Sequence, residues 1–143
     1  MQSLLLDDQL CFALYSAGAA MNKVYRKLLR NLDLTYPQYL IMMALWETDG
    51  VSFSVLGKRL FMEHETLLPL IAHLEASHLV SVTEGESDAD EHRVITLNDS
   101  GRAMAVEARS IYDQVRCAVS YGPSEFANMK HGLELLREKL GEV

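Results

Sequence analysis

The chain has 143 residues, of which 49% are hydrophobic and 23% are charged, and its formal net charge is −7 at pH 7. This length suits one domain, residues 1–143, with a core of its own, and the composition is ordinary for a globular protein. No apolar run approaches the ~20 residues of a membrane-spanning helix, and the N-terminus lacks a signal-peptide pattern. We therefore expect a cytoplasmic protein without a membrane partner.

The two cysteines, Cys11 and Cys117, lie far apart and do not form the closely spaced pairs of a zinc site or a secreted disulfide scaffold. The histidines are also not spaced to place two rings on one helix face. The sequence lacks a glycine-rich phosphate loop, a nucleophile elbow and a paired-carboxylate signature. We expect no enzyme, no metal and no cofactor, and a thiol peroxidase activity of Cys11 is the one enzymatic alternative.

The first expected helix covers residues 7–31 and has an apolar stripe with steps of three and four residues. Cys11 lies at the edge of this stripe, and Tyr15 follows one turn later, close enough to contact its sulfur. Tyr25 lies fourteen residues after Cys11, roughly 21 Å along the helix, and cannot reach the Cys11 of its own chain. It can reach the Cys11 of an antiparallel partner, which favours a dimer. The stripe consists of Leu10, Leu14, Ala17, Met21, Val24 and Leu28.

A second helix is expected to begin after Thr35, whose hydroxyl can cap it, with Pro37 in the first turn. It ends at Asp49-Gly50. Apolar side chains occupy most of its sides, which predicts a central position in the fold. They are Tyr39, Leu40, Met42, Met43, Leu45 and Trp46.

Two short helices separated by a tight turn follow, and this arrangement is a helix-turn-helix. Ser52 caps the first of them, and its inward residues are expected to be Val55, Leu56, Leu60 and Phe61. The second is expected to start at about Glu65 or Thr66, because Pro69 is tolerated only near a first turn. Its apolar face consists of Leu67, Leu70, Ile71 and Leu74.

Two short strands, 79–82 and 93–97, then flank a polar turn at 84–91. A helix-turn-helix followed by a β-hairpin is a winged helix, here at about 35–97. A fifth helix starts at Asn98 or Ser100, and Gly122-Pro123-Ser124 separates it from a sixth. The fold class is therefore mainly α, a winged helix-turn-helix between dimerisation helices at about 5–31 and 98–141. These flanking helices carry more apolar surface than the winged core can cover, which predicts a symmetric homodimer.

This order of elements resembles the MarR family of dimeric winged-helix transcription regulators. Four segments closely resemble its organic-hydroperoxide-sensing branch, OhrR, and they are 4–17, 34–40 (LTYPQYL), 45–47 (LWE) and 66–70 (TLLPL). The resemblance covers nearly the whole chain. It implies a cytoplasmic repressor that binds a double-stranded DNA operator and has an organic hydroperoxide as its inducer.

The resemblance also implies roles for individual residues. The cysteine at the position of Cys11 is the peroxide-reactive residue, and tyrosines at the positions of Tyr25 and Tyr36 come from the other subunit and hydrogen-bond it. The segment 114–117 (QVRC) resembles the region of the two-cysteine subtype that carries the resolving thiol. This would make Cys117 the partner of Cys11 in a disulfide between subunits.

Such a sensor needs a thiolate, because a free cysteine with a pKa of about 8.5 is mostly protonated at neutral pH. The positive end of the helix dipole and phenol donors favour the anion at Cys11, whereas Asp7 and Asp8 oppose it. The sequence leaves the net effect open. Without the resemblance, the pattern favours placing both cysteines in the core, where free cysteines usually lie.

The expected DNA-binding surface is poor in positive charge, although Lys and Arg contacts to phosphates supply most of the affinity of such proteins. Residues 51–100 hold three basic and nine acidic residues, with Asp90-Glu91 near the tip of the wing. Two interpretations follow: unusual but retained DNA binding, or a dimeric redox-responsive interaction protein that has weakened or lost it. The expected contact residues are Lys58, Arg59, His64, Thr66, His73, His92 and Arg93.

Overall fold

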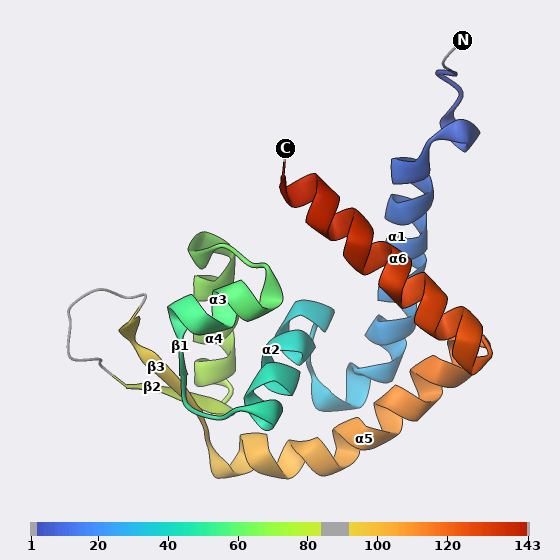
Figure 1. Ribbon diagram of the computed structural model, residues 1–143. Coiled ribbons are helices and arrows are strands. Elements are labelled where there is room, and N and C mark those ends of the chain that lie inside the picture. Colours follow the sequence, from blue (N-terminus) through green and yellow to red (C-terminus); the bar gives the residue numbers. More distant parts are fainter. Residues whose placement is uncertain (1–2, 84–91, 143) are drawn as a thin grey trace.

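The computed structural model describes residues 3–83 and 92–142, and in these ranges helices surround one small antiparallel sheet (Figure 1). The elements are α1 (Leu10–Leu28), α2 (Tyr36–Glu47), β1 (Val51–Ser52), α3 (Phe53–Leu60), α4 (His64–Ala76), β2 (Val80–Thr83), β3 (Val94–Leu97), α5 (Asp99–Val119) and α6 (Pro123–Gly141), with single 3-10 turns at Leu6–Asp8 and Arg30–Leu32. The predicted mainly α winged helix-turn-helix is confirmed.

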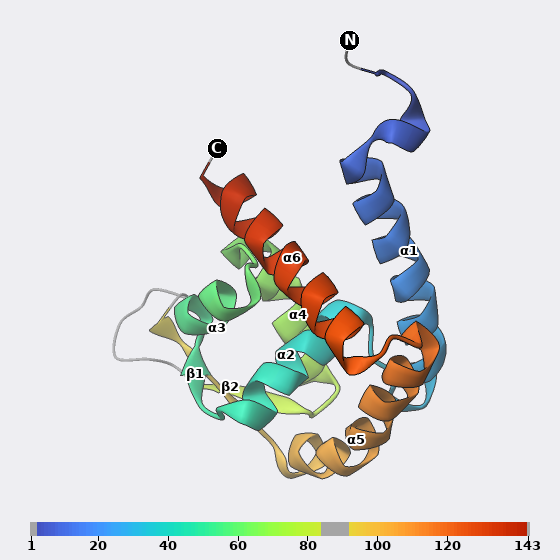
Figure 2. The same ribbon diagram turned by 45° about the vertical axis from the view of Figure 1, so that its right-hand side comes forward.

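The elements from α2 to β3 form a head, and α1, α5 and α6 form arms around and beyond it. Figure 1 and Figure 2 show α5 leaving the sheet beneath α2, while α1 and α6 project past the head. Most core side chains belong to the head, together with Leu29 after α1 and one face of α5. Within the described residues, no helix has both the length and the apolar character needed to span a bilayer.

The start of α2 follows the predicted cap. Thr35 accepts a hydrogen bond at its Oγ1 from the Gln38 backbone N–H at 3.4 Å, and the Gln38 side chain accepts one from the Thr35 N–H at 3.0 Å. This reciprocal pair satisfies two amides that a helix start leaves without partners. The central position of α2 is also confirmed, because Ile41, Met42 and Leu45 are fully buried.

The inward face of α3 differs from the predicted one. Ser52 caps the helix as predicted, accepting from the Val55 N–H at 3.2 Å. Leu56 is buried, but Val55 is 55% exposed and Phe61 is 67% exposed. Phe53 fills the core instead, because it lies one turn before Leu56 whereas Val55 faces the other side. Phe61 lies beyond the last helical residue in a left-handed conformation.

Helix α4 begins at His64, earlier than predicted, so Pro69 lies inside the helix rather than in its first turn. Proline has no N–H to donate to the carbonyl of Glu65. Because Pro69 lies on the exposed side of the helix, water can take the place of the lost bond. The predicted apolar face is otherwise correct, since Leu67, Ile71 and Leu74 are buried and Leu70 is half-buried.

The sheet has the order β1-β3-β2 with antiparallel pairing throughout. The two predicted strands are present within one residue of their expected bounds. Strand β1 was not expected, because two residues are too short to show a strand period. It pairs Val51 with Ile95 and Ser52 with Val94, and so attaches the start of α3 to the wing. The expected turn at 84–91 lies outside the described residues.

The first predicted helix is divided. A 3-10 turn at Leu6–Asp8 precedes α1, and another at Arg30–Leu32 follows it, ending at Asp33 with φ 53°. Asn98 precedes α5 as expected, but its side chain bonds outside the helix. Its Oδ1 accepts from the Ser81 hydroxyl at 2.5 Å and its Nδ2 donates to the His78 carbonyl at 3.1 Å.

Gly101 joins the start of α5 to the head, because a Cβ there would collide with the backbone carbonyl of Leu79. We therefore expect Gly101→Ala to lower the free energy of unfolding by about 1–3 kcal/mol, as overpacking does. Gly132→Ala is the control, since a Cβ at this helical position meets nothing within 4 Å. It should raise the free energy of unfolding by about 0.5–1 kcal/mol. Urea unfolding followed by circular dichroism measures both, and equal stabilities would contradict the close approach.

Candidate functional site

Cys11 is the second residue of α1 and is exposed, with its thiol free. No side chain caps the start of this helix, whose N-cap residue is Gln9, so side chains leave its first amides unpaired. An anion near these amides is stabilised by the helix dipole. The interpretation of Cys11 as a small core residue is therefore wrong for the protomer, and the structure shows an exposed thiol at the start of α1.

Tyr15 lies on α1 one turn after Cys11 and is 74% exposed. Cys117, the other cysteine, lies in the last turn of α5 and is also exposed and free. The corner that follows it is fixed by a cation–π contact, with the Arg116 guanidinium carbon 3.6 Å from the centre of the Phe126 ring. The second cysteine is thus also outside the core of the protomer.

The other end of α1 carries a cluster of phenols. The ring centre of Tyr25 lies 4.3 Å from that of Tyr36 and 5.9 Å from that of Tyr39, both on α2. The structure thus brings Tyr25 and Tyr36 together. It does not bring them to the Cys11 of their own chain, because α1 is one continuous helix and holds Tyr25 roughly 21 Å away.

Tyr39 also belongs to this cluster, although its place in the apolar pattern of α2 predicts only a core residue. Its spacing of three residues from Tyr36 on the same helix was the available signal. The Tyr39 ring also lies 6.3 Å from that of Trp46, whose indole N–H donates to the Gly101 carbonyl at 2.9 Å. The phenols are therefore connected through α2 to the start of α5.

The phenols of the cluster hold their protons tightly. Burial first, and then the neighbouring phenols of Tyr36 and Tyr39, raise the pKa of Tyr25 to about 12. Burial also raises the pKa values of Tyr36 and Tyr39. All three side chains are consequently neutral O–H groups at physiological pH, which is the form that can donate a hydrogen bond to a thiolate.

The predicted DNA-contacting residues are distributed over α3, α4 and the base of the wing. Lys58, Arg59, Thr66, His73 and His92 are exposed, while His64 and Arg93 are half-buried. His64 packs edge-on against Phe53, with ring centres 5.6 Å apart. Arg59 already forms an ion pair with Glu47 at 3.4 Å, and both side chains are largely exposed, so the pair is weak. Asp90 and Glu91 at the wing tip lie outside the described residues.

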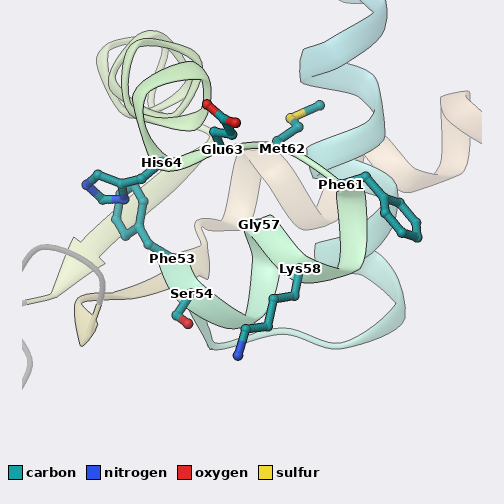
Figure 3. A pocket seen from close by; sticks show the side chains of 8 residues that line it. All are labelled: Phe53, Ser54, Gly57, Lys58, Phe61, Met62, Glu63 and His64. Carbon is teal, nitrogen blue, oxygen red and sulfur yellow. The ribbon is translucent and has the colours of Figure 1, made fainter. Parts of the chain in front are cut away.

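A shallow pocket of about 480 Å³ lies at the turn between α3 and α4 (Figure 3). Phe53, Phe61 and His64 give it aromatic walls, and Lys58 and Glu63 extend from different sides of the turn. Helix α4 contains no Lys or Arg. The described residues also contain no group of three His, Cys, Asp or Glu side chains that could hold a metal ion.

Comparisons with known proteins agree with the fold. No protein-family model matches the chain. The organic hydroperoxide resistance transcriptional regulator of Bacillus subtilis is 32% identical over 136 residues, covering 94% of this chain and 91% of that protein. The regulator TtmR of Methylorubrum extorquens is 47% identical over 100 residues, 69% of this chain, but the match spans only 50% of TtmR.

Solved structures of AbfR, a protein of Staphylococcus epidermidis, share the architecture. Reduced AbfR bound to DNA is 27% identical, with a TM-score of 0.78 over 96% of this chain and 93% of that chain. The disulfide form of AbfR is 28% identical, with a TM-score of 0.63 over 96% of this chain and 90% of that chain.

The head with its wing and the exposed arms define a winged-helix transcription regulator. The chain belongs to the MarR family and, within it, to the organic hydroperoxide resistance type. The predicted family and the predicted class of function, a DNA-binding transcriptional regulator, are confirmed.

The raised pKa of Tyr25 predicts a loss of stability in alkali. Unfolded tyrosine releases its proton near pH 10, whereas Tyr25 in the folded protein holds it to about pH 12. Between these values the folded state binds more protons, so the free energy of unfolding falls as pH rises. We expect Tyr25→Phe to make this fall shallower. Tyr112→Phe, at a position 60% exposed, is the control and should leave it unchanged.

Unfolding by urea at several values between pH 9 and pH 12 measures this slope. A slope in the Tyr25→Phe protein as steep as that of the parent would contradict the burial of this phenol.

Proposed function

We propose that the chain is a cytoplasmic homodimeric repressor that binds its operator while Cys11 is reduced and releases it when an organic hydroperoxide oxidises Cys11. The observation that carries this proposal is the separation of an exposed thiol and a neutral phenol cluster along one helix. The relative from Bacillus subtilis, named for organic hydroperoxide resistance, supports the choice of oxidant.

Exposed apolar side chains on the arms support the homodimer. In α1 and α6 no residue is buried, although both helices carry large apolar side chains. Leu10 is 66% exposed and Met129 is 50% exposed. Such a surface favours association of two copies, because each copy covers the apolar residues of the other. Further exposed apolar side chains of the arms and of the segment before α1 are Leu4, Leu5, Leu6, Leu14, Val106, Leu133, Leu135 and Leu140.

Antiparallel packing of the two α1 helices would place Cys11 of one chain beside Tyr25 and Tyr36 of the other. Their O–H groups would donate hydrogen bonds to the thiolate, which lowers its energy relative to the thiol. The thiolate attacks one oxygen of the hydroperoxide. An S–O bond forms, the O–O bond breaks, and the alkoxide that leaves takes up a proton to become an alcohol. Cys11 is then a sulfenic acid.

Cys117 is proposed as the resolving thiol. Its sulfur attacks the sulfenic sulfur of Cys11 in the other subunit, an S–S bond forms, and hydroxide leaves and is released as water. The exposure of Cys117 at the end of α5 supports this role, because the attack needs access. A new bond between α1 and α5 of different chains would change the packing of the arms and so the spacing of the two heads.

The conformation of this chain is more similar to a DNA-bound structure than to a disulfide-bonded one, which supports the proposal that it is the DNA-binding conformation. Its TM-score is 0.78 to reduced AbfR bound to DNA and 0.63 to the disulfide form. The proposed DNA contacts are Lys58, Arg59, His64, Thr66, His73, His92 and Arg93. A second candidate, an interaction protein that has lost operator binding, is favoured by one observation, the absence of Lys and Arg from α4.

The test is operator release. DNA selected in vitro from a random library with the reduced protein should lose affinity by roughly 5- to 150-fold after treatment with cumene hydroperoxide, the range of a typical coupling. The Cys11→Ser protein should bind the same DNA, and treatment with the hydroperoxide should not change its affinity. Cys117→Ser should still be oxidised but form no disulfide between chains, as seen by mass spectrometry without reductant.

The outcomes separate the two candidates. Release of DNA from Cys11→Ser as readily as from the parent would remove Cys11 as the sensor. Failure of the reduced parent to select any DNA at low salt would favour the interaction protein.

The origin of the phenols can be tested with hybrid dimers. One chain carries Cys11→Ser, and the other carries Tyr25→Phe and Tyr36→Phe. The remaining Cys11 then has intact phenols only across the interface, and we expect it to react with hydroperoxide at the parental rate per thiol.

The matched control places all three substitutions in one chain and none in the other. Here the remaining Cys11 faces two phenylalanines, and its rate should fall by at least roughly tenfold, since hydrogen bonds to a charged group contribute about 1.5–3 kcal/mol. The reverse order of rates would show that each chain supplies its own phenols.

A further inference from the structure

Helix α6 returns from the arms to the helix-turn-helix, and Arg137 in its second half contacts Phe61 there. The guanidinium carbon of Arg137 lies 4.1 Å from the centre of the Phe61 ring, within the range of a cation–π contact. In the view of Figure 2 the C-terminal half of α6 crosses in front of α4, and the cation–π contact shows where it meets the head. This contact joins an arm to the turn between the two helices of the DNA-binding motif.

Phe61 is an unusual residue for its place in that turn. It ends α3 with φ 57° and ψ 38°, the left-handed conformation that glycine adopts at helix ends with least strain. A bulky side chain there is an outlier, and this ring is also 67% exposed, so burial does not offset the strain. A strained residue that the local fold does not need points to a function elsewhere.

The turn that carries Phe61 is too tight to absorb a displacement. The Met62 N–H donates to the Gly57 carbonyl at 2.9 Å, and a Cβ on Gly57 would lie 2.9 Å from the Met62 carbonyl oxygen. Two residues after Phe61, Glu63 is the N-cap of α4. A displacement of the Phe61 ring is therefore expected to move the start of α4 with it, because the turn between them is tightly packed.

Helix α6 has few other attachments to its protomer. It contains no buried residue, and among the described residues the cation–π and ring contacts that join it to other elements are two. Arg116 and Phe126 hold its start to α5, and Arg137 and Phe61 hold its second half to the head. The second contact is therefore a direct link between α6 and the head, in addition to the links that α1 and α5 make to it.

We propose that Arg137 and Phe61 are a positioning pair that fixes the helix-turn-helix relative to the arms, so that two heads of a dimer match two half-sites of DNA. The proposal rests on the proposed function, because it assigns these residues a part in operator binding. Neither residue needs to touch DNA. The pair sets the spacing and orientation of the two heads. Loss of the Arg137–Phe61 contact therefore weakens only the binding that needs both heads on DNA at once.

The experiment compares a duplex with two half-sites and a duplex with one, both taken from the in vitro selection with the parent protein. Arg137→Ala should weaken binding to the double site by roughly 2- to 5-fold, the size of an exposed cation–π contact. Binding to the single site should stay at the parental value. Lys139→Ala removes the same charge from α6 without touching Phe61, and should leave the ratio of the two affinities unchanged.

Phe61→Gly removes the ring and suits the left-handed turn, so this variant should unfold no more easily than the parent. It should show the same loss on the double site, and adding Arg137→Ala should cause no further loss. Arg137→Lys keeps the cation and should restore part of the affinity.

Amide hydrogen exchange in residues 57–66 reports on the pair without DNA, and should be faster in Arg137→Ala than in Lys139→Ala. Equal affinity ratios in these two variants, or equal losses on single and double sites, would overturn the positioning role. If the parent selects no DNA, the proposed function fails and with it the role in DNA binding. Exchange still decides separately whether the contact between α6 and the turn exists.

Discussion

The structure depends on one constraint, that α1 packs against the head only at its C-terminal end. Leu29, just beyond the helix, is fully buried and Tyr25 is half-buried, whereas Leu10 is 66% exposed and Cys11 is exposed. One rigid helix therefore separates the thiol from the phenols by roughly 21 Å. No rotation of side chains closes this distance within a protomer, so a site that joins Cys11 to Tyr25 and Tyr36 needs a second copy. The uncovered apolar residues of the arms supply the driving force for such pairing.

The phenol end of α1 is firmly connected to the DNA-binding head. Tyr25 packs on Tyr36 and Tyr39 of α2, and Tyr39 packs against Trp46, which bonds to the Gly101 carbonyl at the start of α5. Close packing of this kind moves as a unit or not at all. A change of charge or covalent state at a thiol held by these phenols would act together on α2 of the head and α5 of the arms, which Trp46 and Gly101 connect.

Features that depend on residues close together in the sequence were predicted correctly, and features that depend on distant contacts were not. Thr35 and Ser52 were correctly assigned as caps because a cap is decided within three residues. The inward face of α3 was predicted wrongly because an eight-residue helix has too few turns to define its phase, and β1 shows no period at all. The roles of Cys11 and Tyr25 came from the family resemblance. The sequence pattern by itself favoured buried cysteines, since it shows an apolar face but not whether that face meets the core or a second chain.

Because the head carries few positively charged side chains, DNA binding would depend more on how the two heads of a dimer are oriented relative to each other. Helix α4 has no Lys or Arg, and the Arg59 guanidinium forms an ion pair with the Glu47 carboxylate. The head therefore offers few positively charged side chains that can contact DNA phosphates and release their counterions. A protein with many phosphate contacts can lose one half-site and still bind through the general attraction of charges. With few such contacts, most of the binding free energy must come from two heads that fit their half-sites simultaneously, and small rotations then cost a large share of it. In the proposed function, a modest contact such as that between Arg137 and Phe61 would therefore have a measurable effect on operator binding. The same low charge would let a small change in the arms release the operator.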